Sequence, residues 1–568
     1  MELLQQYFDT AFAAPDGIPR LRELILKLAM QGKLVPQDPN DSPASELIRT
    51  IEAEKKRLVK ERKIKAPKTL TEITASDEPY SLPHGWQWVR LGAIGNIFNG
   101  NSINASEKES KYAGVEGLPY IATKDVGYGF EPLVYDNGIC IPPDEEKFRI
   151  AHQGAVLICA EGGSAGKKCG LTDRDICFGN KLFANELHGQ IPSRFILYIY
   201  LSPAFRASFT AAMTGIIGGV SIAKFVEIPI PLPPLEEQHR IVAKVDQLIA
   251  QCDVLENLRI EREKKRLASH AAALSQLLDT TGNSSADDAW AFITQHFGDL
   301  YSVKENVTEL RKAILQLAVM GKLVLQDPND QPSIELLKEI EAERRAQVKA
   351  GKIKLPKPLP PIRSDEMPYK IPDTWQFVYL QDLCSLITDG THQTPKYTET
   401  GRPFISAQCV KPFKFMPEKC RYVSEDAYQA YIKNRKPDIK DILLSRVGAG
   451  IGEAAIIDVD LDFAIYVSTG LLKPFKDQVL PEYMVAWLNS PVGREYSRNN
   501  TLGIGASQGN LNLNLIRQFP VSLPPIQEQH RIVAKINRLM SLCNALDEKI
   551  DAAGNQQAAL LNALMGQM

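Results

Sequence analysis

Two glycine-rich segments are the first places where residue type and spacing could support chemistry in this 568-residue chain. Gly162-Gly-Ser-Ala-Gly-Lys-Lys168 follows an apolar run, as a phosphate-binding loop would. That motif, however, requires glycine in place of Glu161 and serine or threonine in place of Lys168. A second segment, Gly448-Ala-Gly-Ile-Gly452, has no lysine at all. The pattern favours tight turns between strands, although a glycine turn also lets the backbone approach a ligand closely, here a DNA backbone or groove edge.

The charged segments do not form a recognisable catalytic pattern either. Pro143-Asp-Glu-Glu-Lys147 has the residue types of a nuclease, but consecutive carboxylates point apart along an extended chain, which favours a solvated turn. Glu237-Gln-His-Arg240 follows two prolines and occurs twice, which favours capping and packing of a helix start over a catalytic histidine. The sequence has no Walker lysine, nucleophile elbow, dinucleotide fingerprint, adenine-methylase tetrapeptide, H-x-x-x-H or C-x-x-C. We therefore expect neither catalytic residues nor a metal site.

The composition is that of an ordinary globular protein without a strong overall charge. Lys+Arg 66 against Asp+Glu 68 gives a net charge of −2, so no global basic field indicates a nucleic acid. The longest apolar run, Phe195–Leu201, is too short to cross a membrane, and we expect no secretory signal. The nine cysteines are therefore expected to be reduced, mostly core thiols in a cytosol.

The elements that must position these segments occur twice, in a tandem duplication of about 280 residues. Gly32–Asp41 returns with one substitution as Gly321–Asp330. Glu237–Lys244 returns letter for letter as Glu528–Lys535, in each copy two residues after a Leu-Pro-Pro segment. Between these near-identical connectors the two copies differ widely, which predicts a common framework that carries two divergent inserts.

The connectors have the periodicity of helices. Ile241, Val245, Leu248, Cys252 and Leu255 follow the alternating spacing of a coiled-coil seam, and the second copy has the same rhythm from Ile532 onward. At 1.5 Å per residue, a helix from Glu236 to about Asp279 would be ~65 Å long. The further expectations are short amphipathic helices at 21–28 and 310–317, charged helices at 45–62 and 333–349, and a linker at 280–288.

Two clusters of basic residues accompany the charged helices, at 55–65 and 344–354. Such runs are usually solvated helix faces, with contact to DNA phosphates as the alternative. The inserts contain short β-branched and aromatic runs among many glycines and prolines, which is typical of mixed α/β domains. They are nearly neutral, with 13 basic and 14 acidic residues in 87–235 and 16 and 15 in 376–526, so neither would bind DNA tightly by electrostatics alone.

These features together resemble the specificity (S) subunit of Type I restriction–modification systems. The resemblance is carried by Pro231–Val242 and Ser522–Val533, each a Leu-Pro-Pro-hydrophobic-x-Glu-Gln segment that closes a divergent insert, and by the Gly-Lys-Leu-Val segments after short helices. It covers essentially the whole chain. It implies an α+β fold in which an antiparallel coiled coil of long helices separates two target recognition domains, with a pseudo-twofold relation from the duplication.

The resemblance divides the chain into five regions. They are an N-terminal helical region 1–86, recognition domain one at 87–235, a central helical region 236–375, recognition domain two at 376–526, and a C-terminal helix 527–568. It implies a non-catalytic subunit that binds double-stranded DNA, one half-site per domain, with the coiled coil setting the gap. The implied partners are a modification (adenine methyltransferase) subunit in two copies and a restriction (translocase–nuclease) subunit. S-adenosylmethionine, ATP and magnesium belong to those partners.

Polar and basic residues on the insert loops are the candidates for reading bases, because Arg and Lys suit guanine and Asn and Gln suit adenine. In the first insert these are Lys124, Ser164, Lys167, Lys168, Asn180, Lys181, Ser221 and Lys224. In the second they are Thr391, Gln393, Gln408, Lys411, Arg446, Ser468, Gln508 and Asn510. The alternative function is a duplicated coiled-coil adaptor that assembles other proteins without reading DNA.

Overall fold

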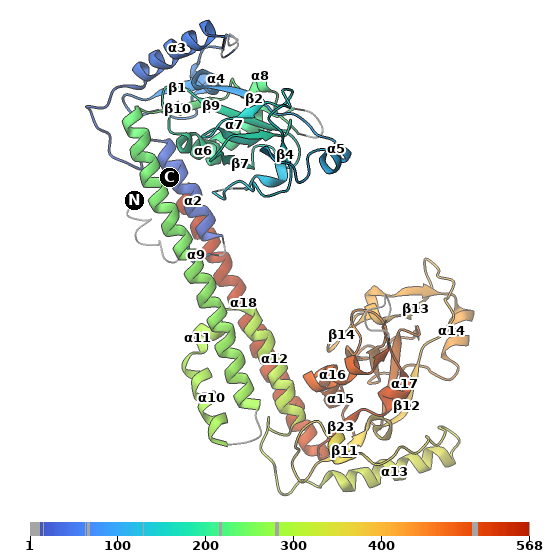
Figure 1. The fold of residues 1–568 in the computed structure, drawn as a ribbon. Helices are drawn as coiled ribbons and strands as arrows, with labels where there is room; N and C mark the ends of the chain where they lie inside the picture. Colours follow the sequence, from blue (N-terminus) through green and yellow to red (C-terminus); the bar gives the residue numbers. More distant parts are fainter. Residues whose placement is uncertain are drawn as a thin grey trace. The chain divides into compact units, whose positions relative to one another are not determined.

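A computed structural model describes residues 12–14, 16–62, 64, 69–128, 130–214, 218–278, 283–502 and 509–566. The chain forms two compact units, Met1–Glu261 with Gly554–Met568, and Arg262–Ala553 (Figure 1). Each unit contains one insert and a set of helices. Within the described residues, no helix is both long and apolar enough to span a membrane.

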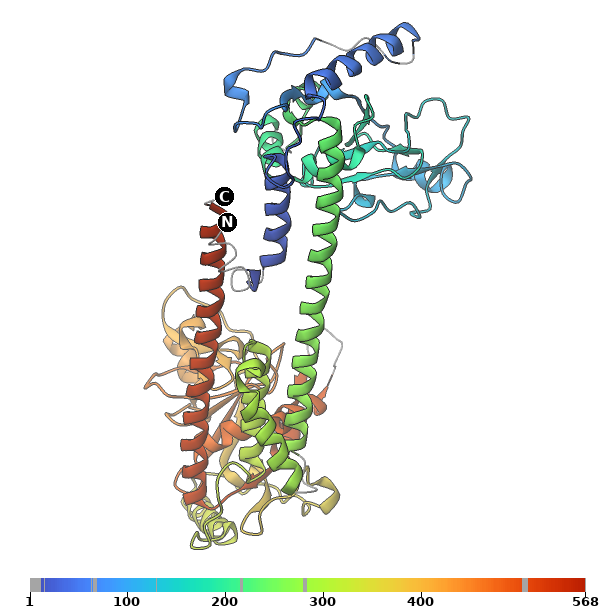
Figure 2. The same ribbon diagram turned by 90° about the vertical axis from the view of Figure 1, so that its left-hand side faces the viewer.

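The two predicted long helices are present as α9, Leu235–Leu278, and α18, Ile526–Gly566. Each is uninterrupted and contributes residues to both units. In the first unit, α2 (Gly17–Met30) lies along the first half of α9, and Arg22 forms ion pairs with Asp253 at 2.6 Å and Glu256 at 2.7 Å (Figure 2). In the second unit the end of α9 packs with α12 (Lys304–Val319) and the beginning of α18, so the two long helices run antiparallel there.

The predicted linker at 280–288 is wrong for residues 283–288, which are helical. Asn283–Gln295 forms helix α10, followed by α11 at Phe297–Leu300, and residues 279–282 lie outside the described part of the chain. Ala289 and Ile293 of α10 are buried, and Ile293 belongs to the core of the second unit. The Ser, Asn and Asp residues that suggested a loop stand at the beginning of this helix, a position that such residues also favour.

The first insert contains two small sheets. One is antiparallel in the order β2-β9-β6-β7, and the other, β4-β3-β8-β5, includes the parallel pair β3 and β8. The strands are β2 Gly95–Asn99, β3 Leu118–Ile121, β4 Cys140–Ile141, β5 Ile150–Ala151, β6 Val156–Cys159, β7 Cys169–Leu171, β8 Ile176–Phe178 and β9 Leu182–Leu187. The helices are α4 Leu91–Ile94, α5 Ala105–Ser110, α6 Ser193–Leu201, α7 Pro203–Ala212 and α8 Ile222–Phe225. The seven-residue apolar run predicted from sequence is α6, which is buried along its whole length after Arg194.

The second insert repeats this arrangement despite its different sequence. Its first sheet has the order β12-β20-β17-β18, and its second, β16-β13-β19, again includes a parallel pair. The strands are β12 Cys384–Asp389, β13 Arg402–Ile405, β14 Val410–Lys411, β15 Lys414–Phe415, β16 Arg421–Val423, β17 Ile442–Ser445, β18 Ala454–Ile456, β19 Ala464–Ile465, β20 Thr469–Pro474, β21 Thr501–Leu502 and β22 Asn510–Leu511. The helices are α14 Glu425–Ile432, α15 Pro481–Asn489, α16 Pro491–Asn499 and α17 Leu513–Arg517.

Each insert begins and ends on one antiparallel strand pair. β1 (Gln87–Arg90) pairs with β10 (Pro229–Leu232), and β11 (Gln376–Tyr379) pairs with β23 (Pro520–Leu523). The chain therefore leaves and re-enters the helical framework at the same place. This explains how the sequence between the connectors can diverge while the connectors stay nearly identical.

The repeated connector residues form the same buried contact in both copies. The Glu237 carboxylate accepts hydrogen bonds from the Trp86 indole at 2.8 Å and the Gln37 amide at 2.6 Å. The Glu528 carboxylate accepts them from Trp375 at 2.8 Å and Gln326 at 2.5 Å. Burial raises the pKa of both carboxyl groups, and these hydrogen bonds oppose the shift. The predicted packing role of this helix start is confirmed.

Removing either carboxylate should destabilise the protein strongly. Glu237→Ala would leave the buried Trp86 indole N–H without an acceptor, so we expect a loss of about 1–3 kcal/mol and a lower thermal midpoint, and the same for Glu528→Ala with Trp375. The indole partners make tryptophan fluorescence a direct readout. Glu236 is exposed at the same helix start, and Glu236→Ala should change the midpoint little. Equal, small effects of all three substitutions would contradict the buried-contact assignment.

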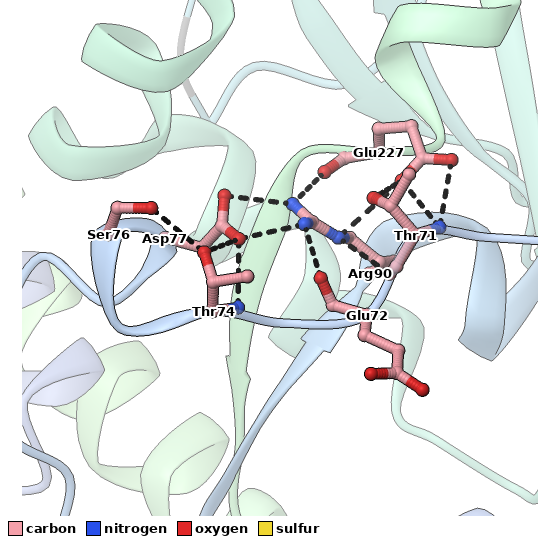
Figure 3. Close-up of polar contacts among 7 residues, drawn as sticks. All are labelled: Thr71, Glu72, Thr74, Ser76, Asp77, Arg90 and Glu227. Atoms are coloured by element: carbon pink, nitrogen blue, oxygen red, sulfur yellow. Dashed lines mark hydrogen bonds and ion pairs between the residues drawn. The ribbon is translucent and has the colours of Figure 1, made fainter.

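Arg90 ties the segment before the first insert to the base of that insert (Figure 3). Its guanidinium donates to Asp77 at 2.9 Å and to the backbone carbonyls of Glu72 at 3.0 Å and Glu227 at 2.8 Å. Hydrogen bonds from Thr74, with a further one from Arg90, lower the pKa of Asp77 to about 2. The stability that this carboxylate contributes is present above its ordinary pKa of 3.8 and is lost as the pH falls toward 2.

Candidate nucleic-acid interface

Four loops of the first insert meet at one end of its β2-β9-β6-β7 sheet. The Ala160 N–H donates to the Lys181 carbonyl at 2.8 Å, and the Ala160 carbonyl accepts from the Val220 N–H at 2.9 Å. Lys168 reaches across to the Thr123 carbonyl at 3.0 Å. We call this surface the first loop cluster, and its segments are 122–128, 160–168, 179–181 and 218–221.

The loops of the second insert are joined by the same pattern of backbone hydrogen bonds. The Arg446 N–H donates to the Ser468 carbonyl at 2.8 Å, and the Arg446 carbonyl accepts from the Leu511 N–H at 2.9 Å. The Ala407 N–H donates to the Ser468 hydroxyl at 3.1 Å. This surface is the second loop cluster, with segments 389–393, 406–411, 446–453, 466–468 and 509–511.

The glycine-rich segments lie in these clusters, as turns between strands. Gly162 has φ +89° and Gly448 has φ +93°, and a Cβ at either position would meet no atom within 4 Å. The left-handed backbone therefore requires glycine, while the space beside it is open. The tight-turn interpretation is confirmed, and the open side is where a ligand backbone could approach.

The structure brings most first-insert candidates together in the first loop cluster. The exposed ones are Lys124, Lys167, Asn180, Lys181, Ser221 and Lys224, whereas Ser164 and Lys168 are half-buried. Several have internal partners: Lys181 lies 3.8 Å from Glu161, and the Ser221 hydroxyl caps the short helix α8 by accepting from the Lys224 N–H. Lys167 donates to the Gly163 carbonyl at 3.3 Å. The cluster thus presents amines and an amide to solvent from loops that backbone hydrogen bonds hold together.

The second-insert candidates converge in the same way. Gln393, Gln408, Lys411 and Asn510 are exposed, Thr391 and Ser468 are half-buried, and Gln508 lies outside the described residues. The Gln408 amide donates to the Lys419 carbonyl at 2.8 Å, which leaves its side-chain oxygen for other donors. Thr391 joins the cluster through its N–H, which donates to the Ile465 carbonyl at 3.1 Å.

Arg446 does not fit the expectation of an exposed loop residue. It is 5% exposed and forms an ion pair with Asp389, itself 6% exposed. Its guanidinium also donates to the Leu511 carbonyl at 2.9 Å and the Val467 carbonyl at 3.1 Å. The side chain therefore holds three segments of the second loop cluster together. Gly470 makes room for it, because a Cβ there would lie 3.2 Å from the Arg446 stem.

The basic clusters on the connector helices are partly structural. On α3 (Ala44–Lys60), Lys55 donates to the Gly92 and Ala93 carbonyls at 2.8 and 3.0 Å, and burial lowers its pKa. On α13 (Ser333–Lys349), Arg344 is 8% exposed and donates to the Asp382 carbonyl at 2.6 Å. These two side chains anchor the helices to the inserts. Arg57 and Arg345 form ion pairs with Glu61 and Glu341, at 3.9 and 2.9 Å. Lys63 and Lys65 lie outside the described residues, and contact of these clusters with DNA phosphates stays a prediction.

Sequence reasoning missed two exposed aromatic residues beside the loop clusters. Tyr128 is 58% exposed, its hydroxyl lies 3.3 Å from the Ser164 hydroxyl, and the Lys168 amine lies 4.9 Å above its ring. Phe413 is 47% exposed. Aromatic residues within inserts of this composition are usually core residues, and exposure in the fold distinguishes these two from the buried aromatic residues.

The described residues contain no cluster of three or more His, Cys, Asp or Glu side chains that could hold a metal ion. Their open, polar loop clusters resemble a binding surface more than a reaction centre. Polar and basic side chains on loops that are held in place can form hydrogen bonds with base edges and phosphates.

Comparison with known proteins gives consistent matches over most of the chain. The family model for the Type I restriction modification DNA specificity domain matches residues 83–263 and 372–553. The Type I restriction enzyme EcoAI specificity subunit of Escherichia coli is 33% identical over 96% of this chain and 93% of that protein. The EcoEI specificity subunit of Escherichia coli is 30% identical over the same shares. The crystal structure of the HsdS subunit from Thermoanaerobacter tengcongensis aligns with a TM-score of 0.43 and 17% identity, covering 85% of this chain and 97% of that one.

Proposed function

Because the chain belongs to the family of Type I restriction–modification specificity subunits, we propose that its two loop clusters are the surfaces that read the two half-sites. The chain is non-catalytic and directs a Type I complex to a bipartite DNA target. Its two inserts are target recognition domains. The proposal assigns the reading of bases to particular residues within them.

One observation carries this proposal: the same backbone frame presents different side chains in the two inserts. The bonds of Ala160 in the first cluster have their counterparts in those of Arg446 in the second. The first cluster is dominated by lysines and the second by glutamines and asparagine. Since lysine suits guanine and Asn or Gln suits adenine, the two half-sites should differ and the target should be asymmetric.

The near-identical connectors suit two copies of one partner. We expect a modification subunit, an adenine methyltransferase, to dock once on each copy, with a restriction subunit, a translocase–nuclease, joining the assembly. S-adenosylmethionine, ATP and magnesium would act on those partners, in the cytoplasm of a prokaryotic cell. The nearly neutral inserts release few counterions, so the partners would supply much of the phosphate neutralisation.

Paired substitutions test the assignment of one cluster to one half-site. Lys124→Ala with Lys181→Ala removes two exposed amines from the first cluster, and Gln393→Ala with Asn510→Ala removes two amides from the second. Each good base contact contributes about 1–3 kcal/mol of discrimination. We expect each pair to relax selectivity at one half-site only, by about tenfold or more.

The measurement is competition binding by the reconstituted complex with its methyltransferase. The competitors are duplexes altered in one half-site or in the other. Exposed Glu236 on helix α9 provides the control, and Glu236→Ala should leave both selectivities unchanged. If both pairs relaxed the same half-site, or neither half-site, the assignment of one loop cluster to each would be wrong.

A further inference from the structure

Phe413 lies at the tip of a short hairpin in an unusual backbone conformation. β14 and β15 are joined by the two-residue turn Pro412–Phe413, and Lys411 pairs with Lys414 across it. Phe413 has φ +62°. With proline before it, the turn has the form in which this second central position normally holds glycine or asparagine, because a Cβ is disfavoured there. A phenylalanine at this position is therefore strained.

Burial does not offset that strain. Phe413 is 47% exposed, whereas Phe415, two residues further on, is 6% exposed and belongs to the core. The Phe413 N–H donates to the Ala454 carbonyl at 2.9 Å, which fixes the tip against the beginning of β18. The fold thus leaves about half of a large apolar side chain exposed on a strained turn that a backbone hydrogen bond holds in place. Strain that the fold itself does not require is characteristic of functional positions.

The hairpin tip lies beside the glycine turn of the second loop cluster. The Lys411 amine is 3.4 Å from the Glu453 carboxylate, and Glu453 closes the turn by donating its N–H to the Gly450 carbonyl at 2.9 Å. Lys411 and Lys414 are both exposed and pair with each other across the turn that holds Phe413. Like charges directly opposite each other on a hairpin are unfavourable, and an anionic backbone on this face would relieve their repulsion.

We propose that Phe413 is a wedge that the second recognition domain inserts between two stacked base pairs of its half-site, with Lys411 and Lys414 on the flanking phosphates. Apolar wedges of this kind unstack a base step and bend the duplex. The inference rests on the proposed function, because it assumes that the second loop cluster faces DNA. It adds a contribution to specificity from DNA deformability at that step, beside direct hydrogen bonds to bases.

The exposed aromatic residue of the first recognition domain, unlike Phe413, has polar partners within its own domain. Tyr128 also stands beside a glycine turn, but its hydroxyl contacts Ser164 and the Lys168 amine covers its ring. It is not among the residues with a positive φ. The wedge is therefore assigned to the second half-site alone, which makes its effect separable from that of the first.

Phe413→Gly tests the role of the ring, because it removes the ring without disturbing the fold. Glycine accepts φ +62° without strain, so this variant should be at least as stable as the unmodified protein, and Phe413→Asn offers a second side chain that tolerates the same backbone. Both should assemble normally with the methyltransferase. Because stacking of an aromatic ring on a base contributes substantially to affinity, both complexes should bind the target on the order of 10- to 100-fold more weakly. Binding to unrelated DNA should change little.

A fluorescent base reports the unstacking directly. 2-Aminopurine, placed in turn at each purine position of the second half-site, should brighten at one step in the unmodified complex and should not brighten with Phe413→Gly. Ile439 is the matched control, because it is 52% exposed and lies before β17, at the end of that strand opposite the glycine turn. Ile439→Ala should leave affinity and fluorescence unchanged.

Three results would overturn the wedge. Unchanged target affinity and fluorescence in Phe413→Gly would show that the ring does not touch DNA. Loss of methyltransferase assembly in that variant would show that the ring docks on protein instead. The third result is that deoxyuridine in place of the half-site thymines weakens binding by the unmodified complex as much as Phe413→Gly does, while 2-aminopurine fluorescence does not increase. The ring would then contact a thymine methyl group in the groove. If the unmodified complex itself ignored the second half-site, the proposed function would fail instead.

Discussion

Exchanging the first recognition domain should change one half of the DNA target and leave the other half and the gap as they were. The exchange replaces residues 87–235 with the corresponding domain of another specificity subunit. It is feasible because β1 and β10 bring both ends of this domain together, with Gln87 opposite Leu232. Each mismatched base pair costs about 1–3 kcal/mol, so affinity for the original half-site should fall by about a thousandfold or more.

The helical framework sets a condition on the donor domain. The core of the first unit includes α6 together with Ile25 of α2 and Ile241 of α9, so the donor must keep an apolar helix at this position. The reciprocal exchange of residues 376–526 is the control, and it should change only the other half of the target. Methylated motifs, mapped in cells that carry each hybrid with the methyltransferase, give the readout. A change in both halves after a single exchange would contradict independent reading.

Matched insertions in the long helices should change the gap between the half-sites. Both α9 and α18 continue from one unit into the other, so four residues are added to each, after Glu261 and after Ala553. Four residues add ~6 Å of helix at 1.5 Å per residue. One base pair occupies ~3.4 Å of duplex, so the gap should lengthen by about one to two base pairs. An unchanged gap in an active variant would show that other contacts set the spacing.

A two-residue insertion is the control for helix phase. It rotates the seam by ~200°, whereas four residues are close to one turn of 3.6 residues. Placing the insertion after Glu261 also spares the Arg259 guanidinium, which donates to the Ala14 carbonyl at 2.8 Å. We expect the two-residue variant to lose assembly and the four-residue variant to keep it, as measured by co-purification with the methyltransferase. Equal behaviour of the two variants would contradict a packed seam.

The helical framework could be predicted from sequence because its signals are local and repeated. The spacing from Ile241 to Cys252 matches the buried face of α9, whereas Leu255, expected in the same seam, is exposed. The duplicated Glu237 and Glu528 indicated a packing role that the contacts to Trp86 and Trp375 confirm. The linker expectation failed because polar residues that favour loops also favour helix beginnings, as at Asn283. Local composition does not separate these two cases.

The candidate site was predicted less well, because exposure depends on partners that are distant in sequence. Arg446 looked like a loop residue that could read guanine, but it is buried and forms an ion pair with Asp389, which is distant in sequence. Lys55 belonged to a basic run, but the Gly92 carbonyl holds it. The sequence does not single out Phe413, because its left-handed backbone and exposed ring appear only in the fold. None of these contacts leaves a periodic signal in the sequence.

The measurement that tests the central claim most directly is the methylated motif in a host that carries this chain and its methyltransferase. Single-molecule sequencing of that genome should reveal one bipartite motif, with two different half-sites separated by a gap of fixed length and unspecified sequence. The motif should disappear when this chain is deleted. A continuous motif, two identical half-sites, or methylation that persists without the chain would contradict the account.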